Sequence, residues 1–147
     1  MKISKKGIDL IKSFEGFEPK MYLDSAGLPT IGYGTLIDEA DEKCLLTATI
    51  NEVAAESLLI NDVSKYEARI APMIKVPLSQ NQYDAIISFA YNVGTTALRK
   101  STLLTKINID PNDPTIESEF TKWVFAGGKK IKGLMNRRLK EAELYSS

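Results

Sequence analysis

The stretch FEGFEPKMYLDSAGLPTIGYG, residues 14–34, combines three acidic side chains and one threonine with several glycines. In front of it, Ser4 can cap a helix whose apolar side chains recur at helical spacing, at Ile8, Leu10, Ile11 and Phe14. Gly16 predicts that this helix ends near Glu15. Residues 21–37 then have the pattern of short strands around a turn. The stretch therefore predicts a small β element directly after the first helix.

Helical patterns dominate the rest of the chain. A capping box at residues 49–52 begins a helix over about 50–70, and a second one at residues 79–82 begins a helix that Gly94 closes. Further helices are predicted over 96–107, from Asp113-Pro114 to near Trp123, and over about 134–145. The charged segment 37–43 is predicted to be a turn. The fold class is therefore α+β and mostly helical.

Composition and charge exclude several classes of function. The 147 residues fit one domain, and 19 basic against 19 acidic residues argue against broad electrostatic binding to nucleic acid. The chain has no histidine, which excludes a Ser-His-Asp triad and histidine metal sites. We expect no metal or cofactor. The single cysteine, Cys44, is expected to be a small buried hydrophobe.

No targeting or membrane segment is predicted. The residues near the N-terminus contain no apolar run of signal-peptide length, and no 18 apolar residues occur together. We therefore expect a chain that is cytosolic when made, with no stable membrane insertion.

The opening stretch also contains a plausible pair of catalytic carboxyls. Glu15 lies between two phenylalanines, where ionisation is costly and a general acid is favoured, while Asp24 lies in a polar turn where it should stay ionised. Two carboxyls in opposed environments are typical of glycosidases. Alternation along TIGYG predicts that Thr30, Gly32 and Gly34 line a smooth trough, with Ile31 and Tyr33 facing a core. A solvated surface loop is the alternative.

Glu15, Asp24 and Thr30 in TIGYG, with this spacing, resemble the Glu–Asp–Thr motif of phage-type lysozymes, glycoside hydrolase family 24. Later blocks resemble that family in the same order: SQNQYDAIISFAYNVG at 79–94, RKSTLL at 99–104 and WVFAGGKKIKGLMNRR at 123–138. The resemblance covers nearly the whole chain.

The resemblance implies a single lysozyme domain over 1–147 with a cleft between two lobes. A small β-containing lobe would span about 15–50, and a long helix would join it to a helical lobe of about 71–147 plus the N-terminal helix. The activity implied is hydrolysis of the β-1,4 bond between N-acetylmuramic acid and N-acetylglucosamine in peptidoglycan. Glu15 would be the general acid, and Asp24 and Thr30 would hold a water on the opposite face of the sugar, giving inversion.

Other residues match family positions that bind substrate: Leu36, Tyr91, Asn92, Ser101 and Arg137. For Tyr91 a place in the core is an equal alternative, and for Arg137 a solvated charge is. Trp123 is expected in the core rather than as a sugar platform. Many relatives have a histidine where this chain has Thr35, so a supporting ion pair is expected to be missing.

The resemblance also implies partners and location. The partner would be the glycan strands of peptidoglycan, with a monomeric enzyme that accumulates in the host cytoplasm and reaches the wall after a holin opens the membrane. Two rivals remain. A wall-binding module without activity should have lost Glu15 or Asp24, and a lytic transglycosylase would leave Asp24 and Thr30 unexplained.

Overall fold

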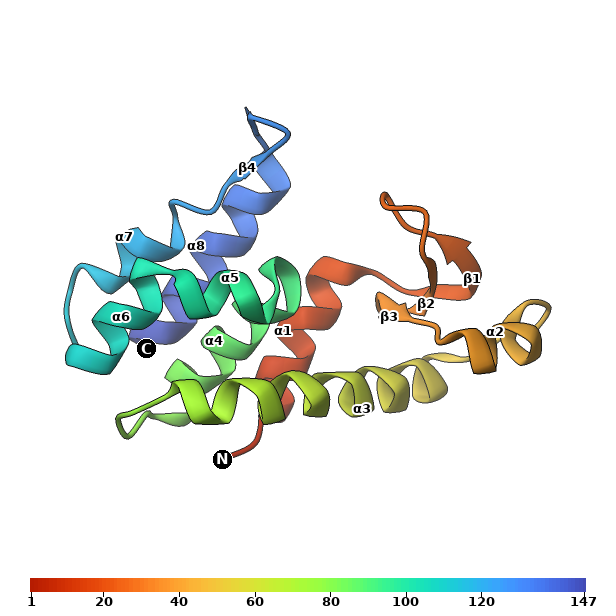
Figure 1. Ribbon diagram of the computed structural model, residues 1–147, viewed down its shortest axis with the longest axis horizontal. Helices are drawn as coiled ribbons and strands as arrows, with labels where there is room; N and C mark the ends of the chain where they lie inside the picture. Colours follow the sequence, from red (N-terminus) through yellow and green to blue (C-terminus); the bar gives the residue numbers. More distant parts are fainter. The chain divides into compact units, whose positions relative to one another are not determined.

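The chain folds as two compact units. A computed structural model describes all residues from 1 to 147, and the units are Asp9–Lys65 and Met1–Ile8 with Tyr66–Ser147 (Figure 1). The helices α1 (Lys5–Glu15) and α3 (Glu52–Ile70) each begin in one unit and end in the other. None of the helices has the length and apolar character needed to cross a membrane. The predicted α+β, mostly helical class is confirmed.

The unit Asp9–Lys65 contains a three-stranded antiparallel sheet. Its strands are β1 (Glu18–Leu23), β2 (Pro29–Gly32) and β3 (Thr35–Leu36), in the order β1-β2-β3, so the predicted β element is confirmed. Fully buried side chains of α1, β2 and α3 form the core of this unit, at Ile11, Ile31, Ala55 and Leu59. The first helix ends at Glu15 as predicted, and the Ser4 hydroxyl accepts a hydrogen bond from the Gly7 amide at 3.4 Å.

Two predictions for the segment after the sheet are wrong. Residues 37–43 do not form a turn, because Glu39–Leu45 form the helix α2. Several acidic residues lie in its first turn, where their charges interact favourably with the helix dipole and stabilise the helix. None of its residues is buried, so the sequence shows no apolar stripe here. Cys44 lies on this helix and is exposed, not buried as expected. The segment lacks the buried face that the sequence rules detect.

The helix α3 begins and ends close to its predicted bounds, but with a different cap. The Asn51 side chain, not Thr49, accepts the hydrogen bond from the backbone amide of Ala54 at 2.8 Å. Asparagine is one of the strongest N-cap residues, and it immediately precedes the first helical residue. At the other end, the chain continues into the short 3-10 helix η1 (Ala71–Met73), which contains Pro72.

The second unit is built around the buried helix α4 (Gln80–Val93). Its capping box at Ser79 and Gln82 is present, Gly94 ends it, and every residue from Tyr83 to Tyr91 is buried. It packs against α8 (Lys132–Ser146) and α5 (Thr95–Lys100). Since all sides of α4 are covered, its apolar character reflects a central position in this unit.

Sequence rules misjudge the connections around α4. The predicted helix over 96–107 is two helices, α5 and α6 (Thr102–Ile109), because the Ser101 hydroxyl accepts from the Leu104 amide at 3.0 Å and starts a new helix. The helix after Asp113-Pro114 is confined to α7 (Ile116–Phe120). Gly127 and Gly128, both with positive φ, turn a hairpin between β4 (Phe125–Ala126) and β5 (Lys129–Lys130).

A buried charged network holds α8 against α4. Glu141 is fully buried and accepts hydrogen bonds from Arg137 Nε at 3.0 Å, from Ser88 Oγ at 2.7 Å and from the Arg138 guanidinium. Arg138 is also fully buried, and its guanidinium lies over the Phe89 ring at 5.0 Å. Removal of this carboxylate would take away the buried counter-charge that Arg137 and Arg138 share at Glu141.

We therefore expect Glu141→Ala to lower the free energy of unfolding by about 3–5 kcal/mol, measured by urea denaturation. Glu143→Ala is the matched control, because Glu143 lies on the same helix and pairs with Lys140 at 3.0 Å in solvent. Its loss should cost less than about 1 kcal/mol. Equal effects of the two substitutions would contradict a structural role for the buried network.

Candidate active site

A row of three side chains crosses the sheet of the unit Asp9–Lys65. Tyr22 on β1 lies opposite Thr30 on β2, and Thr30 lies opposite Leu36 on β3. Residues directly opposite one another in an antiparallel sheet share a face, so all three side chains lie on one side. Thr30 is 2% exposed in the middle of the row, whereas Leu36 at its end is 50% exposed. Two predicted site residues, Thr30 and Leu36, are thus direct neighbours.

The turn between β1 and β2 ties Asp24 and Thr30 to the same residue. One carboxylate oxygen of Asp24, Oδ1, accepts from the amides of Ala26 and Leu28, both at 2.9 Å. The Thr30 hydroxyl donates to the carbonyl of Leu28, also at 2.9 Å. Because that bond uses its only hydrogen, the Thr30 oxygen can only accept from any further partner. The turn therefore presents two acceptors, a carboxylate and a hydroxyl oxygen, held by one peptide segment.

Glu15 is the last residue of α1 and is half-buried. Gly16 follows with φ of 70° and ends the helix, as the sequence predicts. The carboxyl lies against the backbone of Gly34, which has φ of 79°. A Cβ atom at position 34 would lie 2.9 Å from Glu15 Oε2, so it would displace this carboxyl oxygen, and the positive φ itself favours glycine.

The predicted trough along TIGYG is wrong. The strand β2 ends at Gly32, where φ is 68°, so alternation does not continue to Gly34. Gly32 is buried against α3, with an added Cβ 3.1 Å from the Cβ of Ala55. Ile31 and Tyr33 do face a core, at 0% and 5% exposure. The two glycines thus have separate roles, since Gly32 lets the strand pack on a helix and Gly34 gives room to Glu15.

Tyr22 is a site residue that sequence reasoning misses. Burial raises the pKa of its phenol, and the carboxylates of Glu15, Glu18 and Asp24 raise that pKa further. Tyr22 therefore lies within the electric field of both candidate catalytic carboxyls, as well as opposite Thr30. The sequence alone does not indicate this role. Tyr22 becomes a neighbour of Thr30 only through the pairing register of β1 and β2, which the structure of the turn sets.

Comparisons with known proteins match the whole chain. The sequence model of the phage lysozyme family matches residues 12–141. The chain belongs to the phage lysozyme family. An endolysin of Bacillus phage PZA is 40% identical over the full chain, which spans only 56% of that relative's length. A lysozyme mutant of Salmonella phage P22 has 36% identity and a TM-score of 0.86, covering 100% of this chain and 99% of that one.

The muramidase domain of SpmX from Asticaccaulis excentricus is a further match among phage-lysozyme-like structures. It shares 29% identity with a TM-score of 0.87, covering 99% of this chain and 98% of that domain. The resemblance read from Glu15, Asp24 and Thr30 is therefore confirmed at the level of the family. The roles of these three residues, and of the other five matched positions, stay predictions.

In this member of the phage lysozyme family, the other four matched residues lie in the second unit. Tyr91 is 8% exposed and its ring packs on Tyr66 at 5.1 Å. The Ser101 hydroxyl donates to the Leu98 carbonyl at 2.6 Å while it caps α6. Arg137 is 4% exposed and also donates to the Ser88 carbonyl at 3.0 Å, so it is not a solvated charge. Asn92 is exposed.

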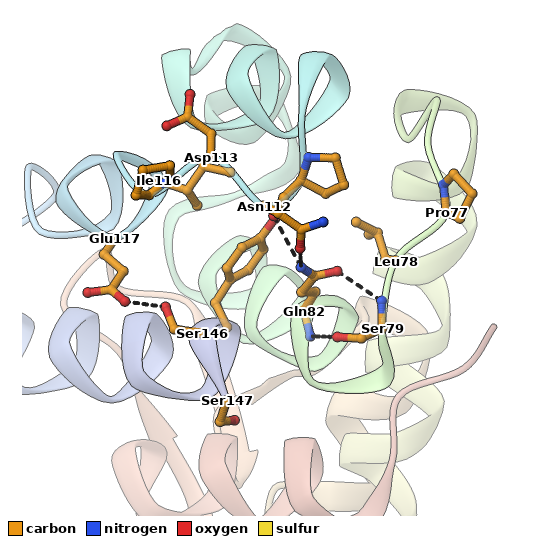
Figure 2. A pocket seen from close by; sticks show the side chains of 13 residues that line it. Pro77, Leu78, Ser79, Gln82, Asn112, Asp113, Ile116, Glu117, Ser146 and Ser147 are labelled. Carbon is orange, nitrogen blue, oxygen red and sulfur yellow. Dashed lines mark hydrogen bonds between the residues drawn. The ribbon is translucent and has the colours of Figure 1, made fainter.

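A cavity of about 640 Å³ in the same unit contains none of the predicted site residues. It lies where the starts of α4 and α7, the segment 111–114 and the end of α8 meet, and Figure 2 shows Gln82 bonded to Ser79 and Asn112 within it. Its polar side chains largely bond one another, as Glu117 does with Ser146. The cavity therefore supplies no catalytic group to the family's motif.

The fit of Gly34 against Glu15 leads to a test with an internal control. Gly27 has φ of 78°, almost the value at Gly34, but an added Cβ there would meet nothing within 4 Å. Gly27→Ala and Gly34→Ala should therefore lose similar stability, about 1–2 kcal/mol, from the positive φ alone. Only Gly34→Ala should shift the carboxyl ¹³C resonance of Glu15, because only its new methyl group displaces that carboxyl. An unmoved Glu15 resonance would contradict the contact.

The field at Tyr22 leads to a second test. Glu15→Gln removes a negative charge that disfavours the phenolate, so the raised pKa of Tyr22 should fall toward its ordinary value. The Tyr22 ¹³Cζ resonance, followed by NMR through alkaline pH, measures this. Glu39→Gln is the control, since Glu39 is not among the charges that act on Tyr22. An unchanged Tyr22 pKa in Glu15→Gln would show that the two groups do not share a field.

Proposed function

We propose that this chain is an endolysin muramidase that hydrolyses the β-1,4 bond between N-acetylmuramic acid and N-acetylglucosamine. The observation that carries the proposal is the pair of acceptors at Asp24 and Thr30 held by Leu28, in the same unit as the half-buried Glu15. Membership of the phage lysozyme family and the likeness to the SpmX muramidase domain support it. A wall-binding module without activity has no need for this set of groups.

Glu15 acts in this proposal as the general acid. It would protonate the glycosidic oxygen as the bond to the leaving sugar breaks, which avoids expulsion of an alkoxide. Two features support the role. The carboxyl lies at a helix end beside the backbone of Gly34, and part of its surface stays open to a ligand.

Asp24 and Thr30 would position the attacking water. A water donates two hydrogens, and the turn offers two acceptors, the second carboxylate oxygen of Asp24 and Oγ1 of Thr30. A water bound through both hydrogens presents a lone pair to the sugar carbon, and Asp24 takes its proton as the new bond forms. Attack by this water on the face opposite the leaving group inverts the configuration, so the first product is the α-anomer.

The substrate in the proposal is the glycan strand of peptidoglycan, cut by a monomer that uses no cofactor. The enzyme would be made in the host cytoplasm and act on the wall after release through a membrane opened by a holin. Leu36, Tyr91, Asn92, Ser101 and Arg137 are proposed to contact or support the bound sugars. The exposed Leu36 and Asn92 are the two that can touch a ligand without rearrangement.

Digestion of purified peptidoglycan tests the reaction. Wild type should release reducing, hydrated muropeptides, identified by mass spectrometry, with the α-anomer formed first by NMR. Glu15→Gln should lower the rate by roughly 10²–10⁴-fold, the range for a lost general acid, without lowering the melting temperature. Glu18→Gln is the matched control, since it removes an exposed carboxyl three residues away and should keep activity.

Each product pattern has one meaning. Anhydro products would show that the reaction is transglycosylation and not hydrolysis. A first-formed β-anomer would exclude the inverting scheme. Full activity in Glu15→Gln would remove Glu15 from the reaction. No products from wild type would leave a wall-binding module as the function of this chain.

A further inference from the structure

Charge is unevenly distributed along the second unit. Although the whole chain has 19 basic and 19 acidic residues, no acidic side chain lies between Glu119 and Glu141, whereas seven basic ones do. At the centre of this interval is the β4–β5 hairpin, and every residue of the stretch 125–132, FAGGKKIK, is exposed. We call this stretch the basic hairpin. Figure 1 shows the tip of the hairpin projecting beyond the start of α8.

Three lysines of the basic hairpin, Lys129, Lys130 and Lys132, have no ion pair in the structure. The other four basic side chains of the interval each pair with an acid: Lys122 with Glu119, Lys140 with Glu143, and Arg137 and Arg138 with Glu141. Neighbouring ammonium groups repel one another, so an anionic surface that neutralises them is stabilising. The uncompensated charge of this unit is thus concentrated on its projecting hairpin.

Two exposed apolar side chains lie among these lysines. Phe125 is 62% exposed and Ile131 is 39% exposed. Phe125 pairs with Lys130 across the hairpin, and residues directly opposite each other share a face, so the ring lies beside the lysine stem. The amide of Ile131 donates to the Val124 carbonyl at 2.8 Å, which holds Ile131 at the base of the hairpin. The basic hairpin therefore presents apolar and positively charged side chains together.

The turn leaves the tip of the hairpin narrow and open. Gly127 and Gly128 have φ of 57° and 77°, a conformation that favours glycine, and a Cβ added at either would meet nothing within 4 Å. No other element covers the turn, and the turn itself carries no side chain. A surface much larger than the hairpin can therefore approach both of its strands.

We propose that the basic hairpin docks this chain reversibly on a membrane surface that contains anionic phospholipids. The ammonium groups of Lys129, Lys130 and Lys132 contact lipid phosphates, and the Phe125 ring enters the boundary between headgroups and acyl chains. Lysine suits this boundary because its alkyl stem lies along apolar surface while its charge stays among the headgroups. The attachment is peripheral, since strands of two residues are far too short to cross a bilayer.

The apolar side chains favour a membrane over a soluble polyanion. A polymer of phosphates would neutralise the lysines but leave Phe125 and Ile131 largely in water. A bilayer interface accommodates both kinds of side chain, because binding there combines buried apolar area with attraction to anionic lipids. Each lysine near such a surface strengthens binding by roughly fivefold, so the three together contribute roughly a hundredfold.

Docking on a membrane goes beyond the proposed function and does not depend on it. A chain made in the host cytoplasm, as proposed above, would gather at the inner face of the membrane through which it is later released. The glycan strands that it cuts are a separate surface.

Sedimentation of the full chain with lipid vesicles tests the docking. Wild type should bind vesicles of phosphatidylethanolamine mixed with phosphatidylglycerol but not vesicles of phosphatidylcholine, which carry no net charge. Added salt should weaken the binding, because exposed charges are screened. Wild type that stays in the supernatant with the anionic vesicles would overturn the proposal.

Charge variants locate the contact. Lys129→Gln, Lys130→Gln and Lys132→Gln together should lower the partition coefficient onto anionic vesicles roughly a hundredfold. The matched control removes the same charge from exposed lysines elsewhere, by Lys2→Gln, Lys43→Gln and Lys65→Gln together. This control should bind almost as wild type does. Equal losses in the two variants would mean that only net charge matters, which would overturn the proposal.

A tryptophan at the hairpin tests entry into the bilayer interface. Because Trp123 is the single tryptophan of the chain, Phe125→Trp in a Trp123→Phe background places the only indole on the hairpin. Its emission should shift to shorter wavelength with anionic vesicles. Ile109→Trp in the same background is the control, since Ile109 ends α6 and is 78% exposed, and its emission should not shift. An unshifted indole at position 125 would contradict entry of this side chain.

Two further results would assign the basic hairpin to another partner and overturn the proposal. One is binding of soluble polyphosphate as tightly as anionic vesicles, which would identify a general polyanion site. The other is loss of activity on purified peptidoglycan, which contains no membrane, in the variant without the three hairpin lysines. We expect that variant to digest purified peptidoglycan at the wild-type rate. Failure of docking and failure of the proposed function thus appear in separate assays.

Discussion

The approach of the Gly34 backbone to the Glu15 carboxyl is the contact on which the candidate active site depends. A helix end places the carboxyl, and a positive φ at Gly34 brings the strand connection so close that an added Cβ would lie 2.9 Å from Glu15 Oε2. Helix termination at Gly16 and the short β2–β3 connection both serve this contact. A glycine is required at Gly34 for two reasons, because an added methyl group would meet both backbone strain and an acid.

The sheet and its first turn hold the other two residues of the candidate site, Asp24 and Thr30. One residue, Leu28, anchors a carboxylate through its amide and a hydroxyl through its carbonyl. Because the hydroxyl hydrogen is used in this bond, the oxygen of Thr30 can only accept further hydrogen bonds, as the carboxylate of Asp24 does. Tyr22 is the third member of the row, and partial burial and the surrounding carboxylates raise the pKa of its phenol. Side chains with ordinary chemistry acquire their roles here from bonds to the backbone.

The second unit solves a different problem, the burial of charge. The carboxylate of Glu141 offsets the charge of two guanidinium groups whose burial would otherwise be costly. One of them, that of Arg138, also donates a hydrogen bond to the amide oxygen of the exposed Asn92. Arginine suits this position because its donors are fixed in a plane and it accepts nothing. The core network therefore also fixes the orientation of the Asn92 amide at the surface.

By itself the sequence determined the class of fold, the bounds of the first, third and fourth helices and the family motif at Glu15, Asp24 and Thr30. These follow from periodicity, capping residues and spacing, which are local properties of the chain. It did not predict α2, the break at Ser101 or the hairpin at Gly127, since an exposed helix has no apolar stripe and a two-residue strand has no period. Tertiary structure alone decided the separate roles of Gly32 and Gly34, the place of Tyr22 and the orientation of Asn92. Each of these depends on an atom from a distant part of the chain, and local patterns contain no information about which distant atoms will meet.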